Sequence, residues 1–119
     1  MGVTGIGGIF FRASDPKALS AWYAETLGVG AGEWGVWQPE AGPSVFLPFA
    51  ADTDYYPADR QWMINFRVTG IDMLISMLRA KGLEIITKAE WDSPEFGRFA
   101  RIHDPEGNPI ELWEPRTEG

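Results

Sequence analysis

The chain has 119 residues, of which 45% are hydrophobic, 23% charged and 13% aromatic, a composition that excludes wholesale disorder and is typical of one folded domain. Seventeen acidic residues against ten basic ones give a net charge of −7, and the cations are scattered, which argues against nucleic acid or an anionic membrane as a partner. The absence of cysteine excludes disulfides and thiolate metal sites, and no apolar run approaches the ~18 residues of a membrane span.

The first predicted elements are a strand over residues 6–13 and a helix that follows it. Asp15 is placed to cap the helix, and Pro16 suits its first turn. Gly28 is a typical helix end. Apolar residues recur at helical spacing between these limits, at Leu19, Trp22, Tyr23 and Leu27. Two short strands are expected next, near 33–38 and 44–49.

The second half repeats this order. Residues 62–68 alternate, with Trp62, Ile64, Phe66 and Val68 predicted on the buried face. A helix is predicted over about 71–81, with Ile71, Leu74, Met77 and Leu78 facing inward. Strands are expected near 84–88, 97–103 and 109–114, with the turn Asp104-Pro105-Glu106-Gly107-Asn108-Pro109 between the last two.

The two halves resemble each other, which predicts a duplication within a single α+β domain, residues 1–119. Ile9-Phe10-Phe11-Arg12 aligns with Ile64-Asn65-Phe66-Arg67, and the turn at Pro39 aligns with the turn at Pro105. The expected organisation is a first βαβββ module over about 5–49, a connection over 50–61 and a second module over about 62–114.

Several motifs together resemble the vicinal oxygen chelate superfamily, which includes glyoxalase I, extradiol dioxygenases, and fosfomycin- and bleomycin-resistance proteins. The motifs are Asp15-Pro16, Trp22-Tyr23, Leu27-Gly28 and, most specifically, the C-terminal DPEGNPIELWEP; the resemblance covers about 5–115. It implies duplicated βαβββ modules whose curved mixed sheet forms a cup, helices on the outer face, and a homodimer.

The same resemblance implies four metal-ligand positions, which fall here at Gly8, Val45, Met63 and Glu111. Only Glu111 offers an oxygen, whereas a catalytic zinc needs about three N, O or S ligands. We therefore expect no cofactor and no metal, unless Glu111 belongs to an atypical site.

Strand alternation predicts the lining of the cup. Ala100, Ile102, Ile110 and Leu112 are expected to face the helices, so their neighbours face the other way. The predicted ligand-binding residues are Phe10, Arg12, Trp37, Met63, Asn65, Arg67, Phe99, Arg101 and Trp113. Aromatic rings with a few convergent arginines suit a small aromatic or conjugated molecule that carries an anionic group.

Glu111 and His103 are the candidate catalytic residues. If the turn pairs Asp104 with Ile110, then His103 lies opposite Glu111 and Arg101 opposite Trp113, and the first pair is suited to proton transfer. The alternatives are that Glu111 is the internal ion-pair partner of Arg101 or Arg67, and that His103 is only a structural hydrogen-bonding residue.

Three functions follow from these observations. The first is a glyoxalase/bleomycin-resistance-like protein that binds a small molecule in the cup without metal. The second is a lyase, isomerase or dioxygenase-like enzyme of the same superfamily that uses Glu111 and His103 or an atypical metal site. The third is an interaction module whose cup is filled by side chains. A cytoplasmic location and a homodimer are expected in each case.

Overall fold

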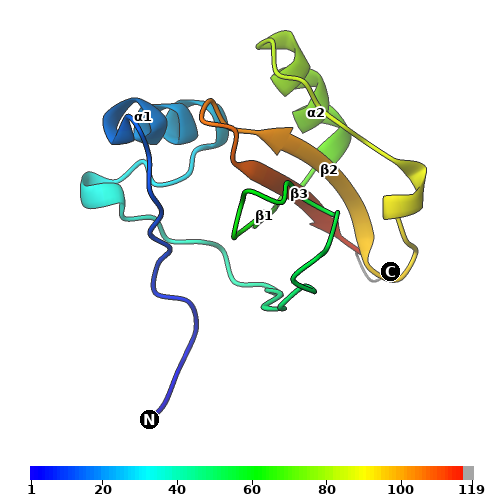
Figure 1. Cartoon of the computed structure of the whole chain (residues 1–119), viewed down its shortest axis with the longest axis horizontal. Coiled ribbons are helices and arrows are strands. Elements are labelled where there is room, and N and C mark those ends of the chain that lie inside the picture. Colours follow the sequence, from blue (N-terminus) through cyan, green and yellow to red (C-terminus); the bar gives the residue numbers. More distant parts are fainter. Residues whose placement is uncertain (117–119) are drawn as a thin grey trace.

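The computed structural model in Figure 1 describes residues 1–116. Its helices are α1 (Pro16–Leu27) and α2 (Ile71–Ala80), with single 3₁₀ turns at Glu33–Gly35 and Ala89–Trp91. Its strands are β1 (Ile64–Arg67), β2 (Gly97–His103) and β3 (Pro109–Pro115). The sheet has the order β1-β3-β2, with β1 parallel and β2 antiparallel to the central β3.

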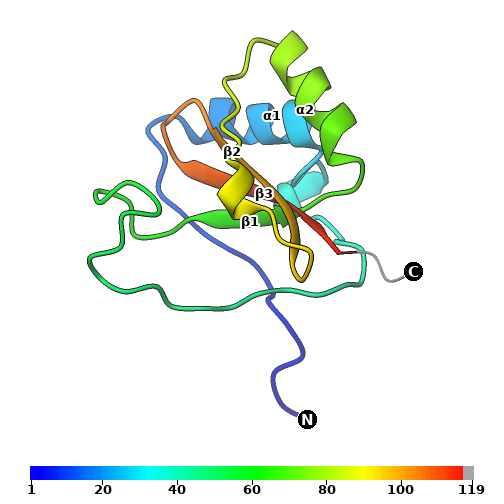
Figure 2. The ribbon, with the colours of Figure 1, turned by 90° about the vertical axis from the view of Figure 1, so that its right-hand side faces the viewer.

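Both helices lie on one face of this mixed sheet, as Figure 2 shows. Side chains from the sheet and from both helices form one apolar core, because alternate residues of β2 and β3 point toward the helices. Its main members are Leu19, Tyr23, Ile71, Ile75, Leu78, Ala100, Ile102, Ile110 and Leu112. The predicted inward positions of β2 and β3 are confirmed, and the α+β class with them.

The helix limits also agree with the sequence. The Asp15 carboxylate accepts a 3.1 Å hydrogen bond from the backbone N–H of Ala18. Gly28 ends α1 with φ = 70°, a conformation that is costly for any residue with a Cβ. In α2, the prediction was wrong for Met77, which is 51% exposed, while Ile75 is buried instead.

In the β2–β3 hairpin, β2 covers the predicted 97–103, and β3 extends one residue beyond the predicted 109–114. The other two strands of this half are shorter than predicted. β1 covers only 64–67 of the expected 62–68, and Trp62 is 68% exposed rather than in the core. The strand expected at 84–88 is reduced to a bridge between Ile86 and Arg101.

The first half has its helix but none of its predicted strands, since no strand occurs before Ile64 in the described chain. Residues 6–11, 36–38 and 44–49 are extended and exposed, and Glu33–Gly35 is a 3₁₀ turn. A strand needs a neighbour with which to form a hydrogen-bond ladder, and these segments have none within this chain. The prediction of three strands there is wrong for the single chain, and the duplication of modules is not confirmed.

Within residues 1–116, neither helix is long and apolar enough to cross a lipid bilayer.

Candidate functional site

The face of the sheet opposite the helices carries a compact group of polar and aromatic side chains. Asn65 of β1 pairs in register with Glu111 of β3, and Glu111 pairs with Arg101 of β2. Arg101 is only 6% exposed and Glu111 only 8%. Two opposite charges are therefore buried as direct cross-strand neighbours, which is costly unless their hydrogen-bonding groups are satisfied.

Both carboxylate oxygens of Glu111 have partners. The Asn65 Nδ2 donates to Oε1 over 2.7 Å, and the Tyr55 hydroxyl donates a short hydrogen bond to Oε2. Tyr55 comes from the connection between the halves, 46 residues from Arg101 and 56 residues from Glu111 in sequence. Sequence reasoning did not place Tyr55 in the site, because no periodicity links an irregular segment to a distant strand.

The surroundings of Tyr55 raise the pKa of its phenol to about 12. Burial is the main cause, and the hydrogen bond and negative charge of Glu111 add to it, while Arg101 opposes them. The phenol therefore stays protonated at neutral pH and acts as a hydrogen-bond donor to Glu111.

Arg101 is held by the same tyrosine rather than by the carboxylate. Its Nη2 donates to the backbone carbonyl oxygen of Tyr55 over 2.8 Å. Its guanidinium carbon lies 5.1 Å from the centre of the Tyr55 ring and 5.6 Å from that of Trp91, which is cation–π geometry. Its Nε is buried and has no hydrogen-bond partner in the described structure.

Both side-chain partners of Glu111 are uncharged. Within residues 1–116, Glu111 forms no ion pair with Arg101 or Arg67. Its partners are instead Tyr55 and Asn65, so the expectation of an internal arginine partner is wrong. The physical reason is that Tyr55 lies between the charges and bonds to both, with its hydroxyl on one and its carbonyl on the other.

His103 does not lie opposite Glu111. The last pair of the β2–β3 ladder is His103 with Pro109, so the predicted register is wrong by two residues. The Asp104 carboxylate causes this, because it accepts from the backbone N–H groups of Glu106 (2.9 Å) and Asn108 (3.0 Å) and closes a shorter turn. His103 is exposed at the end of β2, away from Glu111 in register.

Phe99 and Trp113 are cross-strand partners on the same face as Arg101. Their rings are nearly parallel, at 7°, with centres 6.3 Å apart. The Trp113 indole N–H donates to the backbone carbonyl of Phe96 over 2.8 Å. Two of the predicted ligand-binding residues therefore stack on each other beside the buried charges.

The other predicted ligand-binding residues are spread more widely. Arg67 donates to the backbone carbonyls of Glu40 (2.5 Å) and Pro43, and Met63 is half-buried just before β1. Trp37 packs edge-on against Phe66, with ring centres 6.1 Å apart. Phe10 is 97% exposed, and Arg12 lies at a polar hollow beside Arg60. The single chain does not bring Phe10, Arg12 and Trp37 to Glu111, and their role in binding stays a prediction.

The residues around Glu111 do not fit a divalent metal. Among the residues that the structure describes, no three His, Asp or Glu side chains come together in an arrangement that could hold a metal ion. Both oxygens of the one available carboxylate are already hydrogen-bonded to protein donors. A metal there would have to displace Tyr55 and Asn65 and would gain only one ligand residue.

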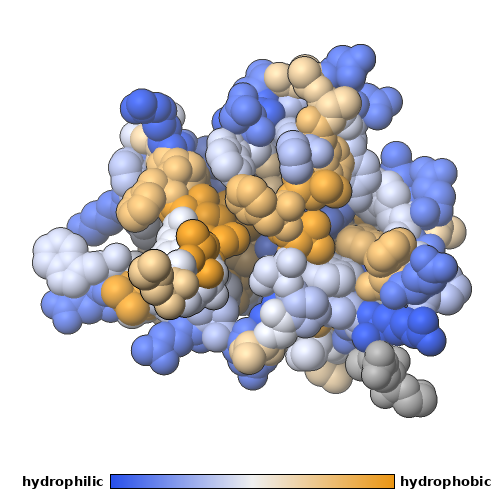
Figure 3. Space-filling model, turned by 90° about the horizontal axis from the view of Figure 1, so that it is seen from below, coloured by the Kyte–Doolittle hydropathy of each residue, from blue (hydrophilic) through white to orange (hydrophobic). Residues whose placement is uncertain are grey.

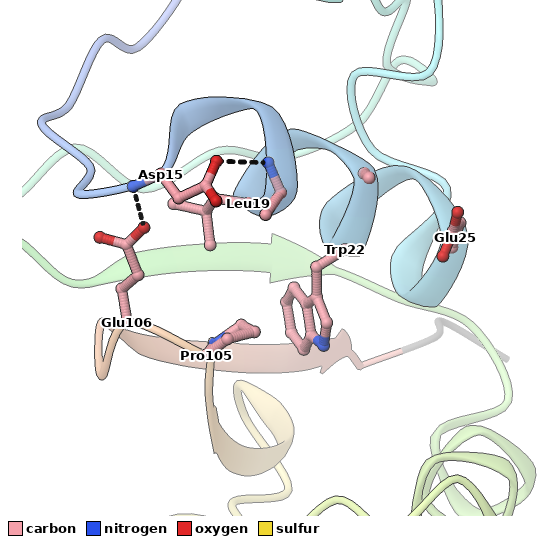
Figure 4. Close-up of a pocket in the computed structure, with 8 residues that line it drawn as sticks. Asp15, Leu19, Trp22, Glu25, Pro105 and Glu106 are labelled. Carbon is pink, nitrogen blue, oxygen red and sulfur yellow. Dashed lines mark hydrogen bonds between the residues drawn. The ribbon is translucent and has the colours of Figure 1, made fainter.

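A hollow of about 470 Å³ lies on another side of the molecule, between α1 and the β2–β3 turn (Figure 4). Trp22 and Pro105 form its apolar part, and three carboxylates line it, those of Asp15, Glu25 and Glu106. Asp15 caps α1, and Glu106 accepts from the backbone N–H groups of Ser14 (2.6 Å) and Asp15 (3.0 Å). The Glu106 carboxylate therefore holds the helix start to the turn, while the Asp15 carboxylate bonds within its own helix.

Comparison with known proteins gives one informative similarity. No protein-family model and no curated protein matches the chain. The structure is similar to a crystal structure of TnmS3, an antibiotic-binding protein from Streptomyces sp. CB03234, with a TM-score of 0.52 and 22% sequence identity. The similarity covers 97% of this chain and 98% of TnmS3, so the two proteins share a fold over their whole length.

Proposed function

We propose that this protein binds a small organic molecule, without a metal ion, on the face of the sheet that carries Arg101 and Glu111. The observation that carries the proposal is the environment of Arg101, a buried cation against two aromatic rings with an unpartnered Nε. Burying an unpaired donor is costly, so this group calls for an acceptor. An oxygen acceptor of the ligand would bond to it.

The class of ligand is proposed by analogy with TnmS3. That protein is an antibiotic-binding protein with the same fold, and bleomycin-resistance-like binding is the metal-free function that the sequence favours. An antibiotic or a similar conjugated natural product would use the rings of Trp91, Phe99 and Trp113 as apolar contacts, with Arg101 recognising an acceptor or anionic group. The strand register does not support the enzymatic alternative, because His103 is paired with Pro109.

We also propose that two copies form the functional unit. Large apolar side chains are exposed along the extended segments 6–11 and 45–49, and Figure 3 shows apolar patches on the side of the molecule seen from below. The outer edge of β1 is open in the described chain, whereas that of β2 is largely covered by the bridges Ile86–Arg101 and Ser93–Gly97. Strand pairing with a second copy would bury these side chains and satisfy the edge of β1.

Screening a library of compounds for binding tests the proposal, with the quenching of tryptophan fluorescence as the readout. The variant Arg101→Lys keeps the charge but removes the planar guanidinium, and it should weaken binding about tenfold or more. The matched control is Arg98→Lys, also on β2, whose exposed side chain pairs with Asp72 over 2.7 Å. Equal affinity in wild type and Arg101→Lys would contradict the proposed site.

A further inference from the structure

The two charged residues of the proposed site are closed off in the single chain. Arg101 and Glu111 are each less than one-tenth exposed, so a ligand cannot reach them without a movement of the residues packed against them. One of these is Tyr55, through which the segment 51–60 bonds to both buried charges.

Tyr55 presents three groups to the site. Its hydroxyl donates to the Glu111 carboxylate, its backbone carbonyl accepts from the Arg101 guanidinium, and its ring lies against that guanidinium. Glu111 as a carboxylate can only accept hydrogen bonds and Arg101 can only donate them, so any occupant must offer a donor to one and an acceptor to the other.

The attachment of residues 51–60 consists mostly of side-chain contacts. The backbone bonds of the segment are local, from Thr53 N–H to the carbonyl of Ala50 and from Arg60 N–H to that of Pro57. Within the described chain, no ladder of backbone hydrogen bonds joins it to the sheet. Segments held in this way open at a smaller free-energy cost than strands do.

From this geometry we propose that Tyr55 is an internal occupant of the binding site, and that the ligand replaces it. The ligand class follows from what Tyr55 supplies: an aromatic ring with a hydroxyl or N–H donor at one end for Glu111, and a carbonyl or carboxylate acceptor at the other end for Arg101. The inference depends on the proposed function, which it deepens by specifying the ligand chemistry.

The probe that tests this inference is 3-(4-hydroxyphenyl)propanamide, which reproduces the ring, the hydroxyl and the carbonyl of a tyrosine residue. The variant Tyr55→Ala removes the ring and the hydroxyl of the internal competitor and leaves only its backbone carbonyl, so the probe should bind to it about tenfold or more tightly than to wild type. Tyr56→Ala is the matched control, because Tyr56 lies in the same segment but its ring contacts Phe49 rather than the charges. Its affinity for the probe should equal that of wild type.

A second compound, 3-phenylpropanamide, tests the role of the hydroxyl. It lacks the donor for Glu111 and should bind Tyr55→Ala about tenfold or more weakly than the hydroxylated probe, because the buried carboxylate oxygen is left unpaired. Equal affinity for the two compounds, or equal affinity of wild type and Tyr55→Ala for the probe, would overturn the inference.

Hydrogen exchange on the wild-type protein gives an independent answer if Tyr55→Ala does not fold. A saturating concentration of the probe should speed the exchange of the amide protons of residues 51–60. Unchanged or slower exchange would overturn the displacement of Tyr55. The proposed function is tested by a different measurement, the effect of Arg101→Lys on the affinity for library compounds. If that effect is observed while 51–60 stays protected, only the inference about Tyr55 is wrong.

Discussion

The phenol of Tyr23 and the carboxylate of Asp104, 81 residues apart, are joined by a buried hydrogen bond of 2.7 Å. Asp104 also accepts from the backbone N–H groups of Glu106 and Asn108 and from the Asn108 side chain. One carboxylate thus shapes the β2–β3 turn and ties it to α1. This contact fixes the helix against the sheet whose opposite face carries Arg101 and Glu111.

The first prediction concerns this contact. Tyr23→Phe removes the hydroxyl and leaves one Asp104 oxygen with a single remaining donor, so the free energy of unfolding should fall by about 1–3 kcal/mol. Denaturant unfolding measures the change. Tyr56→Phe is the control, because the Tyr56 hydroxyl has no hydrogen-bond partner within residues 1–116, and it should change stability by less than about 0.5 kcal/mol. Equal losses in both variants would show that the Tyr23–Asp104 bond contributes nothing specific.

The second prediction concerns stability at high pH. The pKa of Tyr55 is raised to about 12 by burial and by Glu111, and burial together with Asp104 raises the pKa of Tyr23 as well. A raised phenol pKa means that the phenol stays protonated to a higher pH in the folded state than in the unfolded state. The stabilisation is therefore complete below the unfolded pKa of about 10 and is lost as the pH rises from about 10 toward 12.

Thermal unfolding measured across pH 9–12 checks this expectation. Tyr55→Phe should show a shallower loss of stability over that window than wild type, since it has one fewer phenol to ionise on unfolding. Absorbance titration of the phenolates should likewise lose a component near pH 12 in Tyr55→Phe. If wild type and Tyr55→Phe lost stability equally steeply with pH, the raised pKa of Tyr55 would be contradicted.

The third prediction concerns metal. The purified protein should hold no stoichiometric divalent ion, because the Glu111 oxygens are taken by Tyr55 and Asn65 and the other implied ligand positions are Gly8, Val45 and Met63. Elemental analysis after dialysis is the measurement. A metal-to-chain ratio near one that disappears in Glu111→Ala would show an atypical site.

The fourth prediction concerns assembly. If a second copy covers the apolar segments of the first half, the protein is a dimer in solution, and a charge within those segments opposes it. Phe46→Asp, at a position 82% exposed in the single chain, should shift the native mass toward the monomer. Met73→Asp, an exposed apolar residue of α2, is the control and should leave the mass unchanged. A wild-type monomer at micromolar concentration would exclude this assembly.

The sequence by itself determined the features that depend on local chemistry. Asp15, Pro16 and Gly28 act through the backbone of neighbouring residues, so the limits of α1 follow from a short stretch of sequence. Alternation likewise assigned Ala100 and Ile102 to the core and Arg101 to the other face, because a strand turns successive side chains to opposite sides.

The tertiary structure decided the features that join distant segments. The pairing of His103 with Pro109 depends on how the Asp104 side chain closes the turn, which alternation cannot detect, because a shift by two residues leaves every side chain on the same face. The extended first half was predicted as strands from its own residues, but a strand also requires a partner, and the single chain offers none there. Tyr55 reaches Glu111 across 56 residues, through an irregular segment without periodicity, so only packing in three dimensions places its hydroxyl on that carboxylate.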